Sequence, residues 1–151
     1  MRTDRLALLL LLAYLALLAV LTLRPVGADV DTNLRLNLKP FATIGPALRH
    51  GPGSHVFATL LGNLVAFTPL GILLPSAFRR IPWVAVIAAG LALSVAIETA
   101  QLGLSLYLGF GYRAADVDDV IVNVAGTIVG LALVGIVQLI GSLVRGVRSA
   151  G

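Results

Sequence analysis

Residues 6–23 read LALLLLLAYLALLAVLTL, an apolar run that no charged side chain interrupts. At ~1.5 Å per residue, a helix of this length extends roughly 27 Å, close to the thickness of the hydrocarbon core of a bilayer. Arg5 precedes the run and Arg24 follows it, and basic residues are common at the ends of a membrane span. The run is therefore expected to form a transmembrane helix.

A cleaved signal peptide is the alternative interpretation of this run, because Val26-Gly27-Ala28 resembles a small-residue cleavage site. The run is longer than the apolar core of a typical signal peptide, and Arg24 lies between the run and the site. We therefore expect an uncleaved first helix.

The composition extends the membrane assignment to the whole chain. Of the 151 residues, 58% are hydrophobic and 12% are charged, whereas a soluble domain has about 25% charged residues. The predicted fold is all-α, an integral membrane four-helix bundle in a single domain over residues 1–151. The long connection after the first span is expected to be a surface segment with a short interfacial piece around residues 38–44. The four predicted spans lie at about 6–23, 56–74, 82–104 and 117–140.

The basic residues predict the orientation. The net charge is +4, but the basic side chains are spread over helix ends and form no single patch, so no nucleic-acid partner is expected. One side of the membrane would hold Arg2, Arg5, Arg79, Arg80, Arg145 and Arg148. The other side holds the remaining basic residues, most of them in the long first loop. Positive charge marks the cytoplasmic side, so both termini are expected in the cytoplasm.

Polar side chains of three predicted spans are expected in one layer, roughly 5–10 Å beneath the outer surface. They are Asn63 of the second span, Glu98 and Gln101 of the third, and Asp119 and Asn123 of the fourth. Spacings of three and four residues place Asp116 on the same helix face as Asp119 and Asn123. Asp118 is expected to point elsewhere, toward the rim. Three helices thus present polar groups at a matching depth.

Glu98 is the only glutamate of the chain. A carboxylate in a membrane helix costs on the order of 2–3 kcal/mol, so it normally faces the bundle interior or a wet cavity. Arg113 is the nearest cation in the sequence that could pair with it. A purely structural role is the alternative: an ion pair of Glu98 with Arg113 would then only fix the packing.

Structural roles are also open for other polar and small residues. Asn63 and Asn123 would form interhelical hydrogen bonds. Asp116 and Asp118 would be solvated acids at a helix start, favoured by the helix dipole. Gly126 and Gly130 form a small-xxx-small pair that is typical of helix packing. The chain has no cysteine, which excludes disulfides and thiol chemistry.

Three stretches together resemble a known family. They read GNLVAFTPLG at residues 62–71, SVAIETAQ at 94–101 and YRAADVDDVIVNVAG at 112–126. This combination resembles the VanZ-like family, named after a teicoplanin-resistance protein, over roughly residues 10–140. Ala115 departs from the pattern, because the family often has an aromatic or bulky residue there. The family's polar positions map onto Asn63, Glu98, Gln101, Arg113, Asp116, Asp118, Asp119 and Asn123.

The resemblance implies a multi-pass protein of the bacterial cell membrane, in a family with members linked to glycopeptide resistance. We expect an outer-leaflet polar pocket that processes a lipid head group or a lipid-linked envelope precursor, as a phosphoesterase or transferase would. Arg113 would bind a phosphate and Glu98 would transfer a proton. Asp116 and Asp119 would hold a divalent cation, which is left open, or position a nucleophile. Substrate contacts are expected from Asn63, Gln101, Asp118 and Asn123.

Two other functions use the same residues. A binding protein would sequester a lipid or a glycopeptide at the outer surface without chemistry, as an antibiotic-resistance factor. A transporter would need a polar path through the full thickness of the membrane. The cytoplasmic halves of the spans, such as residues 6–13 and 129–140, are largely apolar, which disfavours transport.

Overall fold

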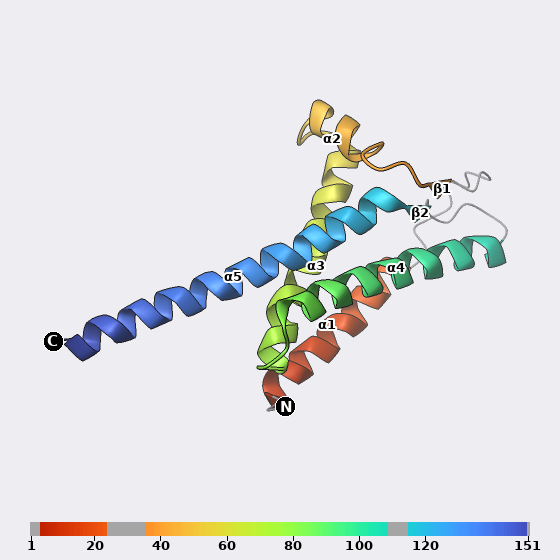
Figure 1. The fold of residues 1–151 in the computed structure, drawn as a ribbon. Coiled ribbons are helices and arrows are strands. Elements are labelled where there is room, and N and C mark those ends of the chain that lie inside the picture. The colour runs from red at the N-terminus through yellow and green to blue at the C-terminus, as the bar shows by residue number, and fades with distance from the viewer. Residues whose placement is uncertain (1–3, 24–35, 109–114, 151) are drawn as a thin grey trace.

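The computed structural model describes residues 4–23, 36–108 and 115–150. Over these ranges the chain forms five helices and two very short strands (Figure 1). In chain order they are α1 (Arg5–Leu23), β1 (Leu36–Asn37), α2 (Ile44–His50), α3 (His55–Ala77), α4 (Trp83–Leu108), β2 (Ala115–Asp116) and α5 (Val117–Ala150). The helices α1, α3, α4 and α5 are long and apolar enough to cross a membrane. The predicted all-α membrane fold with four long helices is confirmed.

Three of the long helices continue beyond the apolar stretches of the sequence. Helix α3 ends at Ala77, α4 at Leu108 and α5 at Ala150, whereas the predicted spans end at about 74, 104 and 140. Pro69 and Pro75 lie inside α3, which is continuous through both. Hydropathy marks where apolar side chains end, but a helix satisfies its own backbone and can continue into the polar interface.

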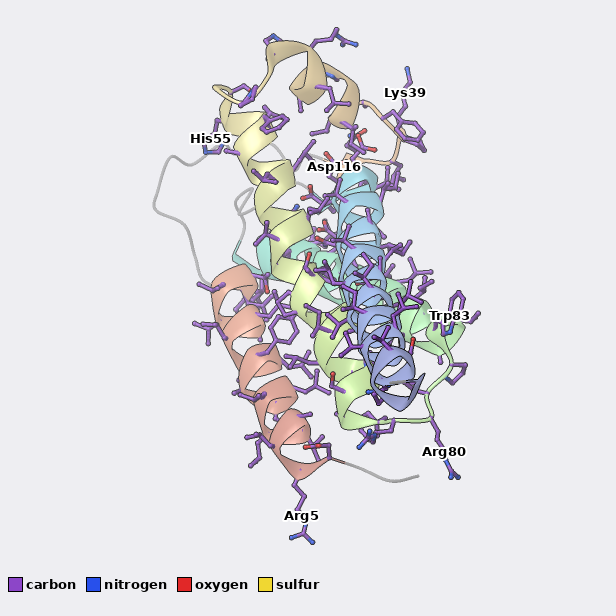
Figure 2. The ribbon with its side chains drawn as sticks, turned by 90° about the vertical axis from the view of Figure 1, so that its left-hand side faces the viewer. Arg5, Lys39, His55, Arg80, Trp83 and Asp116 are labelled. Atoms are coloured by element: carbon purple, nitrogen blue, oxygen red, sulfur yellow. The ribbon has the colours of Figure 1, made fainter. Side chains whose placement is uncertain are left out.

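Helices α3 and α5 make the most extensive contact in the molecule. Figure 2 shows Arg5 and Arg80 at one end of the bundle and Lys39, His55 and Asp116 at the opposite end. We call these the Arg79 end, where α3 ends, and the α2 end, which contains α2, β1, β2 and the first turn of α5. At the Arg79 end, the backbone N–H of Asp4 donates to the carbonyl oxygen of Ala77 at 3.0 Å, which joins the start of α1 to the end of α3.

Glycines allow α3 and α5 to approach closely. A Cβ atom at Gly126 would lie 2.2 Å from the carbonyl oxygen of Leu64, and one at Gly130 would lie 2.1 Å from that of Thr68. The neighbouring atoms are backbone, so they cannot move away as a side chain would. The predicted packing role of Gly126 and Gly130 is confirmed, and it follows the small-residue rule of membrane helix contacts.

A small apolar core joins α1, α3 and α4. It consists of Leu11, Leu18, Phe67, Leu70, Ala77 and Ile97. Beside it, the Tyr14 hydroxyl donates to the carbonyl oxygen of Ala66 at 2.8 Å and so links α1 to α3. Many other large apolar side chains point outward, including Leu6 and Leu9 of α1. An outward apolar surface on long helices is what a lipid bilayer requires of its solute.

Candidate functional site

The first acidic residue within α5 anchors the segment before α2. Asp118 is fully buried. Its Oδ1 accepts the backbone N–H of Phe41 at 2.6 Å, and its Oδ2 accepts those of Thr43 at 2.7 Å and Ile44 at 3.0 Å. Phe41 has a φ of 65°, a conformation that side-chain-bearing residues rarely adopt. Three charge-assisted bonds to one carboxylate hold the turn in place and fix the start of α2 against α5.

The expectation that Asp118 points to the rim is wrong. Its carboxylate points inward because residues 39–43 form a turn over it. The piece expected at the interface around 38–44 contains this turn, and the short helix α2 follows from Ile44. The three donors are backbone N–H groups, which every residue type except proline carries, so no side-chain pattern in the sequence predicts this contact.

Asp116 joins the same turn to the first short strand. Its Oδ1 accepts from Asn37 Nδ2 at 2.9 Å and from the backbone N–H of Asp118 at 2.9 Å, and its Oδ2 accepts from Thr43 Oγ1 at 2.5 Å. Strands β1 and β2 pair in parallel, with Asn37 opposite Asp116. Sequence reasoning missed Asn37 and Thr43, because polar residues in a loop look the same whether they face solvent or a buried acid.

Glu98 connects α4 to this arrangement. It is half-buried, and its Oε2 accepts the backbone N–H of Asp116 at 3.1 Å. The third and fourth spans therefore do bring carboxylates to a common level at the α2 end. Arg113, the cation predicted beside Glu98, lies outside the described residues, so that pairing stays a prediction.

Gln101 and Asn123 form hydrogen bonds between helices. Gln101 Nε2 donates to the carbonyl oxygen of Thr22 at 2.9 Å, which links α4 to the end of α1. Asn123 Nδ2 donates to Ser94 Oγ at 2.9 Å, which links α5 to α4. The interhelical bond considered for Asn123 is thus present. Ser94 was missed as a partner, although it lies four residues before Glu98 and so on the same helix face.

The Oδ1 atom of Asn123 is buried and accepts no hydrogen bond from any residue that the structure describes. Buried polar atoms are usually paired, so this oxygen is a place for a donor from water or from a bound molecule. It lies beside Ser94, one helical turn from Glu98 along α4. The candidate site therefore contains one acceptor oxygen, Asn123 Oδ1, about one helical turn below Glu98.

Asn63 and Asp119 are half-buried, on α3 and α5 respectively. The predicted layer is thus distributed over three helices, but Asp116 and Asp118 have their carboxylates engaged by the chain itself. Within the described ranges, no group of three or more His, Cys, Asp or Glu side chains could hold a metal ion. The divalent cation considered for Asp116 and Asp119 stays a prediction.

Comparisons with known proteins agree with the motif resemblance. Residues 11–138 match the model of the VanZ/LLP1 family. Protein VanZ of Enterococcus faecium is 33% identical over 101 residues, which make up 67% of this chain and 53% of that protein. The chain therefore spans about half the length of this curated relative. No solved structure matches the chain.

The three polar stretches at residues 62–71, 94–101 and 112–126 all lie inside the matched range. They supply Glu98, Asp116 and Asn123, the residues that tie α4 to the start of α5. Motifs, family match and curated relative all lead to one assignment: the chain belongs to the VanZ-like family of membrane proteins.

Proposed function

We propose that the α2 end faces the outside of the bacterial cell membrane and acts on a lipid head group or a lipid-linked envelope precursor. The supporting observation is the position of Glu98, whose Oε2 accepts the backbone N–H of Asp116 where α4 meets the start of α5. A carboxylate near the end of a span is less costly than one at the bilayer centre. It is also within reach of polar head groups.

Glu98 is the proposed general acid or base, and Arg113 the proposed phosphate ligand. Asp116 and Asp118 serve as positioning residues, because they hold the turn at residues 39–43 and thereby the backbone that orients Glu98. The Oδ1 of Asn123, which accepts no hydrogen bond from the described residues, would accept one from a substrate hydroxyl or a bridging water. Asn63, Gln101 and Asp119 complete the proposed surroundings of the substrate.

The orientation has a direct test, because the chain contains no cysteine. Lys39 and Arg80 lie at opposite ends of the bundle (Figure 2), and both are exposed. We expect Lys39→Cys to react with a membrane-impermeant maleimide in spheroplasts, and Arg80→Cys to react only after permeabilisation. The reverse pattern would place the α2 end in the cytoplasm and refute the proposed site at the outer leaflet.

The chemistry is tested by profiling lipids and lipid-linked precursors in cells that express the wild type, Glu98→Gln or Asp119→Asn at matched abundance. We expect one species to change with the wild type and not with Glu98→Gln. Asp4→Asn is the matched control, because it removes a carboxylate at the opposite end while keeping a residue that can cap α1. Equal profiles for the wild type and Glu98→Gln would contradict proton transfer by Glu98.

A second candidate is binding without chemistry, as expected of an antibiotic-resistance factor. The observation in its favour is that the carboxylates of Asp116 and Asp118 already accept hydrogen bonds from the chain, which suits a rigid recognition surface. Purified protein would then bind a lipid or a glycopeptide saturably and release no product. Glu98→Gln would retain most of this binding, since the amide keeps the size and one acceptor oxygen.

A further inference from the structure

Two adjoining cavities lie between α3 and α5 at the Arg79 end, away from the proposed site. One has a volume of about 410 Å³ and is lined by Asp4, Pro75, Ser76, Arg79, Val134 and Gln138. The other has a volume of about 360 Å³ and is lined by Ile72, Ser76, Leu133, Val134, Val137 and Gln138. Because they share Ser76, Val134 and Gln138, they form one continuous groove, which we call the α3–α5 groove.

The α3–α5 groove changes from charged to apolar along its length. Its outer part contains the charged groups of Arg79 and Asp4. Its inner part is apolar, with Leu133 and Val137 exposed by 45% and 69%. Ile72 lies five residues before the end of α3, which is roughly 7.5 Å deeper along the helix. The groove therefore crosses the boundary between head groups and hydrocarbon.

Charge at this end favours an anionic occupant. Arg79 is exposed and makes no ion pair with any residue in the described ranges. Arg5 and Arg80 lie at the same end (Figure 2). Asp4 is the one acid in the groove lining, and its Oδ1 already accepts the backbone N–H groups of Leu6 and Ala7. The groove lining itself holds one arginine and one aspartate, and Arg5 and Arg80 give this end of the bundle an excess of positive charge.

Gln138 places a hydrogen-bonding side chain in the lining of the groove. It is exposed on α5 between apolar neighbours and lines both cavities. Its amide has no hydrogen-bond partner among the residues that the structure describes. Gln138 lies two residues before the expected end of the fourth span and lines the same cavity as Arg79, so its amide is placed to donate a hydrogen bond to a lipid ester.

We propose that the α3–α5 groove binds one anionic phospholipid of the leaflet at the Arg79 end. The phosphate pairs with the Arg79 guanidinium, which is suited to bidentate phosphate binding. The glycerol esters lie beside Gln138 and Ser76, and one acyl chain follows Ile72, Leu133 and Val137. This lipid is distinct from any substrate at the α2 end, and the proposal does not depend on the function of Glu98.

The test uses all 151 residues of the chain in detergent micelles with phosphatidylglycerol and phosphatidylcholine of identical acyl chains. Native mass spectrometry counts the retained lipids. We expect the wild type to retain one phosphatidylglycerol in preference to phosphatidylcholine. Arg79→Gln should lower that preference about fivefold, the contribution expected of one basic residue at a lipid surface. Arg80→Gln, the same charge change on a residue outside the groove lining, should lower it less.

The groove itself is tested by Val134→Phe, which fills the segment shared by both cavities and should lower retention of both lipids. Equal losses in Arg79→Gln and Arg80→Gln would show general charge attraction and overturn the proposal. Wild-type retention by folded Val134→Phe would overturn it as well. Thermal melting in the same micelles checks folding, and if Val134→Phe does not fold, the arginine pair decides alone.

Discussion

The two halves of α5 differ in how they are packed. In the first half, Gly126 and Gly130 contact the backbone of α3 so closely that no Cβ atom fits. In the second half, a Cβ atom at Gly135 or Gly146 would meet nothing within 4 Å. Polar residues show the same contrast, since Asp118 is buried and Gln138 is exposed. The first half of α5 thus packs tightly against α3 and supports the α2 end, whereas the second half is open to lipid.

The largest expected effect comes from a matched pair of glycine substitutions. Gly130→Val places a Cβ atom 2.1 Å from the carbonyl oxygen of Thr68 and 2.9 Å from the Cα of Gly71. The helices must separate, so we expect a loss on the order of 3 kcal/mol or more of unfolding free energy. Gly135→Val, in open space, should unfold like the wild type. Thermal unfolding in micelles compares the two, and equal stability would remove the contrast between the halves.

A smaller but still large effect is expected from Asp118→Asn. The amide retains only one acceptor oxygen for the three backbone N–H groups of Phe41, Thr43 and Ile44. We expect a loss on the order of 2 kcal/mol, because buried donors are left unpaired. Limited proteolysis within residues 39–43 should become faster. A variant as stable and as protease-resistant as the wild type would show that this carboxylate does not hold the turn; Asp4→Asn is the control.

The smallest effect is expected where one interhelical hydrogen bond is removed. Ser94→Ala deletes the acceptor of Asn123 Nδ2 and should lower the unfolding free energy by about 1 kcal/mol. Ser142→Ala is its counterpart in the second half of α5, where the hydroxyl donates only to the carbonyl of Leu139 in the same helix. That variant should have the same melting temperature as the wild type. A larger loss of unfolding free energy in Ser142→Ala would indicate that the second half of α5 contacts a partner.

Sequence periodicity and depth predicted part of this arrangement of polar residues. The spacing of Asn63, Glu98 and Asn123 placed polar groups at one level of three helices, and the bonds of Glu98 and Asn123 connect α4 to the start of α5. The same reasoning failed for Asp118. Helical spacing gives the direction of a side chain around its own helix, but it carries no information about a distant turn that folds over that direction.

The amino-acid sequence alone determined that the protein has four long apolar helices in a membrane, because unpaired backbone groups and charged side chains are unfavourable in hydrocarbon. It also determined which helix faces are polar, because helical spacing is fixed. Only the tertiary structure decided that Asp118 binds three backbone N–H groups. It also decided that α3 is the helix against which Gly126 and Gly130 pack, and that a groove opens at Val134. These features depend on contacts between segments far apart in the chain, which local patterns cannot encode.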